Sequence, residues 1–383
     1  MLNFRKGTLQ DELLQYAEAL HGQDAVAPVS PAAVCKARKN LRYPVFIDLN
    51  QVVVKSFSAH FSLRRWHGFR LLAVDGSTGR LPNTKDITQT FGGPSDAACP
   101  MARFSQLYDV LNKVIVRAHI EPYTTGEREM AAAGLYDTQA DDLLLYDRGY
   151  PAFWLFAMHN DLSRHYCMRV PVAFNREIET FITSGQRSAL ITLTPNSKMT
   201  QQCQEYNLSI EPITARVIRV ELSNGAVEVL ITSLVNEENY PAAWFKPLYQ
   251  QRWGVEEGYK REKSRVEIEN FSGRSTLTVQ QDFHAKILAL NLASITAWVA
   301  QAIADQRYQH RKLRYQVNFA HALSLMKNRL VHIFLGANSI GLCEYLTCQM
   351  ACVVEPVRPN RSYPRNIRSQ KLQGFHGCYK RTR

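Results

Sequence analysis

The sequence predicts an α/β protein built on a mixed sheet, with a helical N-terminal region and a β-rich block inserted into the core. Two near-continuous apolar runs, Phe69–Val74 and Asp142–Tyr146, are typical of strands buried on both faces. Segments with helical spacing of apolar residues flank them, and short β-branched segments fill the region 163–238. The 383 residues are 45% hydrophobic, which excludes a disordered chain and predicts two or three domains.

The N-terminal region is predicted to be helical. Apolar residues repeat at helical spacing in Asp11–Leu20, and Ser30 followed by Pro31 is typical of the start of a second helix. The pattern of a short helix, a turn and a basic helix is similar to a helix-turn-helix DNA-binding unit. The net charge of +12 favours an anionic partner. The alternative is a solvated basic helix of a small bundle. The candidate DNA-binding residues of this helix are Lys36, Arg38 and Lys39.

Strand-like segments follow. The short β-branched runs Val45–Ile47 and Val52–Val54 predict strands, and Tyr108–His119 predicts a further one. Pro151–Leu162 reads as a helix. This mixture of strands and helices is typical of an α/β core.

Two apolar strands end beside an aspartate. Asp75 follows Phe69–Val74, and Asp147 follows Asp142–Tyr146. Because open α/β sheets place ligand chemistry at the C-terminal ends of their strands, both carboxylates are candidate site residues. The alternative candidates, which also lie next to strand-like runs, are Asp48, Asp141 and Asp142. For Asp142 we expect a cap or turn role.

The region 163–238 has a different residue pattern. Short β-rich runs at Ala189–Leu193, Val217–Leu222 and Ala226–Thr232 are separated by turn residues, and Asn224-Gly225 is a strong hairpin signal. This pattern predicts an all-β subdomain inserted into the α/β fold.

A sequence pattern that predicts helices begins again at Pro247 and continues to about Thr347. The uncharged stretch Ile287–Ala304 is as long as a bilayer span, but its polar and small residues favour a helix buried in a soluble core. The tail after Glu355 holds eight Lys and Arg residues and no acid, which favours an irregular arm laid along phosphates. Eight scattered cysteines without a CxxC pair indicate a reducing cytoplasm.

The segment that begins at Pro247 carries a stripe of charged residues. On a single helix, Tyr249, Arg252, Glu256 and Lys263 fall on one face about 21 Å long, and Lys260 lies near it. With Asp75 and Asp147, Glu256 completes a set of three carboxylates. Three neighbouring acids repel one another, and a pair of Mg²⁺ ions relieves the repulsion and supports phosphoryl transfer.

These segments resemble a known family. Tyr249-x2-Arg252-x3-Glu256-x6-Lys263 matches the YREK signature of DDE transposases of the insertion sequence 4 family. These are bacterial cut-and-paste transposases with a ribonuclease-H-like catalytic core. VDGST around Asp75 is similar to the first acidic motif of the family, and YDRGY around Asp147 is similar to the second. The resemblance runs from about residue 28 to the end of the chain.

The resemblance implies a division into five parts. They are an N-terminal helical DNA-binding domain (1–65), the first part of the ribonuclease-H-like core (66–162), a β-rich insertion (163–245), the second part of the core (246–330), and a C-terminal helical segment with a basic arm (331–383).

It also implies a mechanism. Asp75, Asp147 and Glu256 would bind two Mg²⁺ or Mn²⁺ ions and carry catalysis. Water would free a 3′-OH at the transposon end. That hydroxyl would form a hairpin, later reopened, and then join target DNA. Further residues would contact the DNA: Arg252 and Lys263 at phosphates, Tyr249 at the 5′ side of the cut, and Trp244 or Trp253 as the platform for a flipped base.

The expected partners are double-stranded DNA, as transposon ends and target, and a second copy of the chain in a synaptic homodimer. The expected location is the bacterial cytoplasm, at the nucleoid and not in a membrane. Two other functions stay open at this point: a metal-dependent nuclease that cuts without joining, and a non-catalytic DNA-binding descendant of a transposase.

Overall fold

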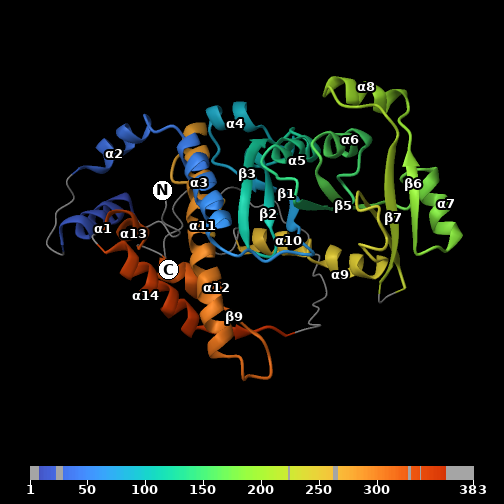
Figure 1. The fold of residues 1–383 in the computed structure, drawn as a ribbon. Coiled ribbons are helices and arrows are strands. Elements are labelled where there is room, and N and C mark those ends of the chain that lie inside the picture. Colours follow the sequence, from blue (N-terminus) through green and yellow to red (C-terminus); the bar gives the residue numbers. More distant parts are fainter. Residues whose placement is uncertain are drawn as a thin grey trace.

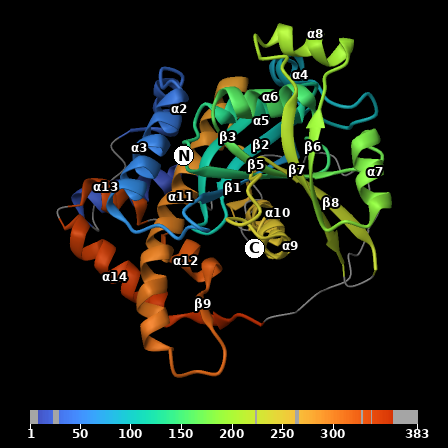
Figure 2. The ribbon, with the colours of Figure 1, turned by 45° about the vertical axis from the view of Figure 1, so that its right-hand side comes forward.

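A computed structural model of the protein describes residues 8–22, 29–222, 225–261, 266–326, 329–336 and 338–358. An eight-stranded sheet runs through the molecule, with helices on both faces (Figure 1, Figure 2). Helices α5 (Glu127–Leu135) and α6 (Phe153–Asp161) cover one face of its core strands. Helices α10 (Trp253–Arg261) and α11 (Thr276–Arg307) cover the other. A separate apolar cluster fills each interface.

The sheet is mixed, as predicted. Strand β4 pairs in parallel with β1 and β5, and the other neighbours are antiparallel. The two apolar runs form the central strands β1 and β4 because both of their faces are buried. In spatial order the strands are β3 (Val114–Pro122), β2 (Met101–Asp109), β1 (Arg70–Arg80), β4 (Asp142–Tyr146), β5 (His165–Val170), β8 (Val227–Thr232), β7 (Ile213–Glu221) and β6 (Ser188–Leu193).

The N-terminal region is helical: α1 (Leu9–His21), α2 (Pro31–Arg38) and α3 (Pro44–His60). The predicted start of α2 is confirmed, since the Ser30 hydroxyl accepts the Ala33 N–H at 3.2 Å. The strands predicted at Val45–Ile47 and Val52–Val54 are wrong, because both segments lie in α3. The buried residues of α3 recur every three or four positions, a helical period that outweighs β-branching: Phe46, Asn50, Val54 and Phe57.

Tyr108–His119, predicted as one strand, is a hairpin. The chain turns between β2 and β3, where the Asp109 carboxylate accepts the Asn112 backbone N–H at 2.9 Å. Lys113 adopts the left-handed region with φ 60°. Apolar residues on both sides of the turn concealed it in the sequence.

The block expected to be all-β contains helices, so that expectation is wrong. Besides the strands β5 to β8 it holds α7 (Arg176–Ser184) and α8 (Ser197–Glu205). The side chains of Asn175 and Asn196 cap them, at 2.9 and 3.0 Å. Strands β6, β7 and β8 continue the core sheet through the pairing of β8 with β5.

The helix predicted from Pro247 is broken. A 3-10 turn, η1 (Ala242–Trp244), leads into α9 (Phe245–Gln250), and a turn at residues 251–252 separates α9 from α10. The single stripe from Tyr249 onward is therefore divided between two helices.

Helix α11 contains the uncharged stretch. It has the length and hydropathy of a membrane-spanning helix, and 56% of its most apolar window is buried within the protein. Its Asn291 amide donates to the Ile115 carbonyl and the Asn50 side chain, each at 2.7 Å. The remaining elements are α4 (Lys85–Phe91), α12 (Phe319–Met326), α13 (Leu330–Leu335), α14 (Ser339–Cys352), β9 (Tyr315–Val317) and β10 (Val354–Pro356). Most of the predicted basic arm, residues 359–383, lies outside the described residues.

Candidate active site

Asp75 and Asp147 lie level with each other on neighbouring strands. The parallel register of β1 and β4 pairs Ala73 with Leu145, and each aspartate follows two residues later. Adjacent strands lie about 4.8 Å apart, so the backbones that carry the two acids are neighbours. Strand β4 ends at Tyr146, and among the described residues no strand pairs with that edge of β1 beyond it.

Glu256 comes from α10, which packs across β1. Two tyrosines join this helical segment to the acid-bearing strands. The Tyr259 hydroxyl donates to the Asp75 backbone carbonyl at 3.0 Å, and the Tyr249 hydroxyl donates to the Tyr146 carbonyl at 3.1 Å. The sequence thus places Glu256 over the strand ends by means of buried hydroxyls on either side of it.

Arg252 is the cation shared by the three acids. Its guanidinium donates to the Glu256 carboxylate at 2.8 Å. Its charge also acts on the carboxylates of Asp75 and Asp147, where it lowers the pKa of each. Only 3% of Arg252 is exposed. One buried guanidinium therefore connects three acids that are far apart in the chain.

Asp147 has a second cationic neighbour. The Arg169 guanidinium donates to Asp147 at 2.6 Å and to Glu228 of β8 at 2.6 Å. Burial alone would raise the pKa of Asp147, but the Arg148 backbone N–H and the two arginine charges outweigh it. The pKa of Asp147 consequently lies below its ordinary value, and the side chain is anionic at neutral pH.

Asp75 has the opposite balance. Burial, the largest cause, raises its pKa to about 6, against the lowering effect of Arg252 and the Gly76 N–H. The negative charges of Glu256 and Glu127 raise it further. Asp75 is therefore a partly desolvated carboxylate, and a cation beside it would stabilise its charged form.

The donor set is compatible with divalent cations. Carboxylate oxygens are the ligands that Mg²⁺ and Mn²⁺ prefer. Among the described residues, no three Asp, Glu, His or Cys side chains are grouped closely enough to hold a metal ion in this conformation. Here Glu256 and Asp147 are turned to their arginine partners, which balance the charges of these two acids.

The alternative aspartates lie elsewhere. Asp48 is exposed on α3. Asp142 opens β4, at the end remote from Asp147, and forms a buried ion pair with Arg70 at 2.7 Å. Asp141 pairs with Arg65 beside it. Their positions leave Asp75 and Asp147 as the acids beside Glu256.

The candidate DNA contacts have different environments. Tyr249 is 6% exposed and Arg252 is equally enclosed, so both serve internal contacts here. Lys36 and Lys39 are exposed on and just after α2. The Lys260 side chain and the whole of Lys263 lie outside the described residues.

Arg38 differs from expectation. Its guanidinium donates to four internal acceptors and joins α2 to α11 and the loop before it, instead of pointing to solvent. These acceptors are Gln281, Ser272, the Thr278 carbonyl and Asp282.

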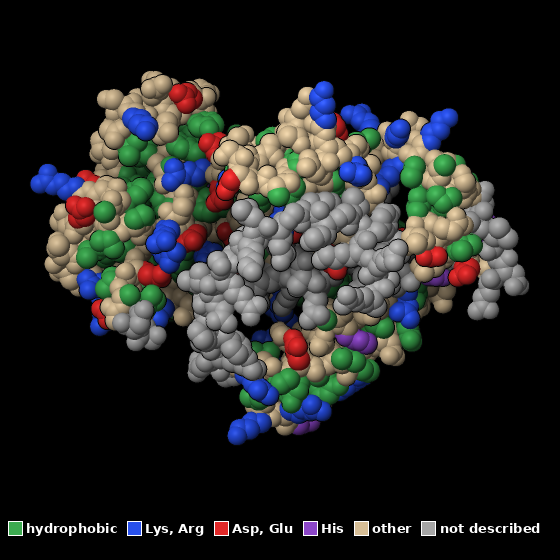
Figure 3. All heavy atoms as spheres, turned by 180° about the vertical axis from the view of Figure 1, so that it is seen from behind, with side chains coloured by type: hydrophobic (Ala, Val, Ile, Leu, Met, Phe, Trp, Pro, Cys, Tyr) green, Lys and Arg blue, Asp and Glu red, His purple; other side chains and the backbone are tan. Residues whose placement is uncertain are grey.

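Sequence reasoning missed several residues. Nothing in the local pattern singles out Arg169, because its role depends on strand pairing. A basic segment between α11 and β9 is visible as the run QHRKLR, and its Lys and Arg side chains protrude at the lower tip of the face in Figure 3. There the Arg311 guanidinium lies over the rings of Tyr308 and Tyr315, at 4.7 and 4.8 Å.

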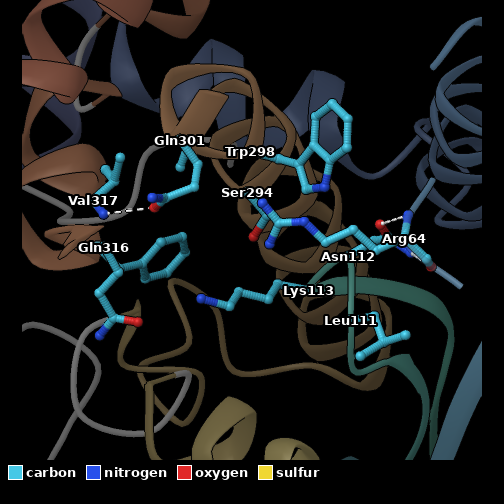
Figure 4. Close-up of a pocket in the computed structure, with 11 residues that line it drawn as sticks. Arg64, Leu111, Asn112, Lys113, Ser294, Trp298, Gln301, Gln316 and Val317 are labelled. Atoms are coloured by element: carbon cyan, nitrogen blue, oxygen red, sulfur yellow. Dashed lines mark hydrogen bonds between the residues drawn. The ribbon is translucent and has the colours of Figure 1, made fainter. Parts of the chain in front are cut away.

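A small cavity lies away from the acids, between the β2–β3 turn, α11 and β9 (Figure 4). Its volume is about 40 Å³, room for no more than a few water molecules. Arg64, Lys113 and Trp298 line it, and the Gln301 side chain beside them accepts the Val317 N–H at 2.8 Å. It is too small to hold a substrate.

The chain is a DNA transposase with a DDE domain. The chain belongs to the Transposase DDE domain family, whose model matches residues 66–292 and so includes all three candidate acids. Members of this family cleave DNA and transfer strands in a reaction that depends on divalent metal ions.

Within it, the chain is similar to transposases of the insertion sequence 4 family. It is 23% identical over 353 residues to transposase InsG for insertion sequence element IS4 of Escherichia coli (strain K12), covering 89% of this chain and 77% of InsG. Among solved structures, a chain of the piggyBac transposase synaptic complex with hairpin DNA superposes with a TM-score of 0.40 and 11% identity. That match covers 76% of this chain and 59% of the piggyBac chain.

Proposed function

We propose that the protein cuts DNA at the ends of an insertion sequence and joins the freed ends to target DNA, with Asp75, Asp147 and Glu256 as its catalytic acids. The observation that carries this assignment is the position of Arg252, whose charge acts on all three carboxylates. The strand order β3-β2-β1-β4-β5 supports a ribonuclease-H-like core around them.

The three acids hold Mg²⁺, or Mn²⁺ in its place. When bound, such ions activate the attacking oxygen and stabilise the leaving oxygen of a phosphodiester. The residues of the chain do the positioning. A DNA strand would approach Asp75 along the edge of β1 beyond the end of β4. Arg252 would give up Glu256 to a bound cation and would supply positive charge beside the scissile phosphate.

Double-stranded DNA is the partner that the charge distribution favours. The exposed lysines Lys36 and Lys39 and the basic segment between α11 and β9 are candidate phosphate contacts. Lys260 and Lys263 belong to the same proposal through the YREK signature. We propose that the active form is a homodimer that bridges two transposon ends in the cytoplasm.

The test uses linear DNA that carries the terminal sequences of the encoding element. Asp75→Asn, Asp147→Asn and Glu256→Gln are each expected to abolish cleavage while end binding in a gel-shift assay persists. A variant that cuts at the normal rate removes that residue from the site. Cleavage by the unaltered protein without joined products identifies a nuclease, and binding without cleavage identifies a non-catalytic descendant.

A further inference from the structure

A fourth acid lies beside the three already described. Glu127 is in the first turn of α5, on the face of the sheet opposite to α10. Its carboxylate lies against Gly76, the residue after Asp75. Strand β4 ends at Tyr146, level with the residue before Asp75, and α5 and α10 lie on opposite faces of the sheet there.

Gly76 makes this approach possible. A Cβ atom at position 76 would lie 2.8 Å from the carboxyl carbon of Glu127 and 3.0 Å from its Oε1. The missing side chain thus forms a cradle that the Glu127 carboxylate fills. Since the backbone at this position does not have positive φ, close approach explains the glycine better than a turn does.

A buried hydroxyl points to the same place. Tyr150 is 2% exposed, and its hydroxyl has no hydrogen-bond partner among the described residues. The charges of Glu127, Asp75 and Asp147 all act on this hydroxyl and add to the effect of burial in raising its pKa. A buried polar group without a partner, next to three acids, indicates a site that holds a further ligand.

We infer that Glu127 is a fourth carboxylate of the divalent-ion site and faces it from the side opposite to Glu256. This inference rests on the proposed function. In the present conformation the Glu127 carboxylate accepts from the Arg103 guanidinium at 2.7 Å. The same arrangement holds for Glu256 with Arg252 and for Asp147 with Arg169. Each of these three acids thus has an arginine partner.

The other explanation is structural, since Glu127 could serve α5 alone, through its ion pair or the helix dipole. Glu129 provides a matched control for the dipole. It belongs to the same first turn, is exposed, and folds back over the N-cap residue Gly126. Arg103 provides the control for the ion pair.

The experiment titrates the full chain, without DNA, with Mn²⁺ alone and follows free Mn²⁺ by electron paramagnetic resonance. Glu127→Gln is expected to weaken Mn²⁺ binding by about tenfold, whereas Glu129→Gln leaves it unchanged. Arg103→Gln is expected to tighten binding, because it removes the cation that competes for Glu127. A purely structural ion pair predicts instead that Arg103→Gln and Glu127→Gln weaken binding alike, and that outcome overturns the inference.

Asp75→Asn separates this inference from the proposed function. If Asp75→Asn weakens Mn²⁺ binding and Glu127→Gln does not, only the fourth carboxylate is refuted. If neither does, the proposed metal site itself fails. Thermal unfolding of each variant checks that it folds. If Glu127→Gln does not fold, Glu127→Asp takes its place, because it keeps the negative charge on a shorter side chain. It is expected to weaken Mn²⁺ binding where Glu129→Asp does not, and equal affinities for the two variants would again count against the inference.

Discussion

The Tyr259 hydroxyl donates a hydrogen bond to the backbone carbonyl of Asp75, at 3.0 Å, and so connects the helix of one proposed catalytic acid to the strand of another. Tyr249 makes the equivalent bond to the residue before Asp147. Both rings are 6% exposed. The relative position of the three acids is therefore fixed by two buried hydroxyls as well as by apolar packing.

We expect Tyr259→Phe to lower the free energy of unfolding by about 1 kcal/mol, since a buried hydrogen bond is lost while the ring stays. Cleavage should slow more than end binding weakens, because α10 loses its attachment to β1. Urea unfolding and single-turnover cleavage measure the two effects. Tyr136→Phe, on a side chain that is 71% exposed, is the control. Unchanged cleavage in Tyr259→Phe would argue that apolar packing alone sets the position of α10.

Gly76→Ala tests the close approach of Glu127. The new methyl group must displace the Glu127 carboxylate, which is at the end of a flexible side chain and can move. We expect the fold to persist and Mn²⁺ binding to weaken by about tenfold, as for Glu127→Gln. In a Glu127→Ala background the same glycine substitution should have little further effect, because the carboxylate is already gone. Additive losses in the double variant would contradict this coupling.

Arg38 and Lys36 test which residues of α2 serve the fold. Arg38→Ala removes the partner of Asp282, whose side chain is fully buried, and should cost about 2–4 kcal/mol of the free energy of unfolding. Lys36→Ala removes an exposed charge and should change this free energy by less than about 0.5 kcal/mol. We expect Lys36→Ala to affect DNA binding instead. The salt dependence of the binding constant should decrease by about the contribution of one phosphate contact. Equal stability of the two variants would show that the Arg38 contacts contribute little.

The sequence predicted the two central strands because their signals are local, and it pointed to three candidate acids. Phe69–Val74 and Asp142–Tyr146 are apolar on both faces, and their ends mark Asp75 and Asp147. Glu256 was found from its spacing to Tyr249 and Arg252, although that spacing crosses a break between two helices.

Other features depend on tertiary contacts and left no local signal. Arg169 meets Asp147 only because β5 pairs with β4, and Glu127 meets Gly76 only because α5 packs over β1. In α3, β-branched residues suggested strands, but burial of one helical face against α11 determined the structure. Composition could not reveal that the inserted strands continue the core sheet.

Asp75 and Asp147 should respond in opposite ways to the same substitution. The pKa of Asp75 is raised from its ordinary value of 3.8 to about 6, chiefly by burial, so the folded protein binds a proton there more tightly than the unfolded chain does. Between these values stability falls as pH rises, and above about pH 6 the charged carboxylate destabilises the fold by about 2–3 kcal/mol. Asp75→Asn removes this charge. Without metal, it should stabilise the protein at pH 8 and have little effect near pH 4.

The pKa of Asp147 is lowered in the folded protein, where Arg169 and the Arg148 N–H outweigh burial, so its charge stabilises the fold above its ordinary pKa. Asp147→Asn should therefore destabilise the protein at pH 8, and the loss should shrink as pH falls through the folded pKa. Urea unfolding of both variants and the unaltered chain, in EDTA at the two pH values, measures the difference. If both substitutions destabilise at pH 8, the charge at Asp75 is compensated in the fold, and its burial does not destabilise the protein.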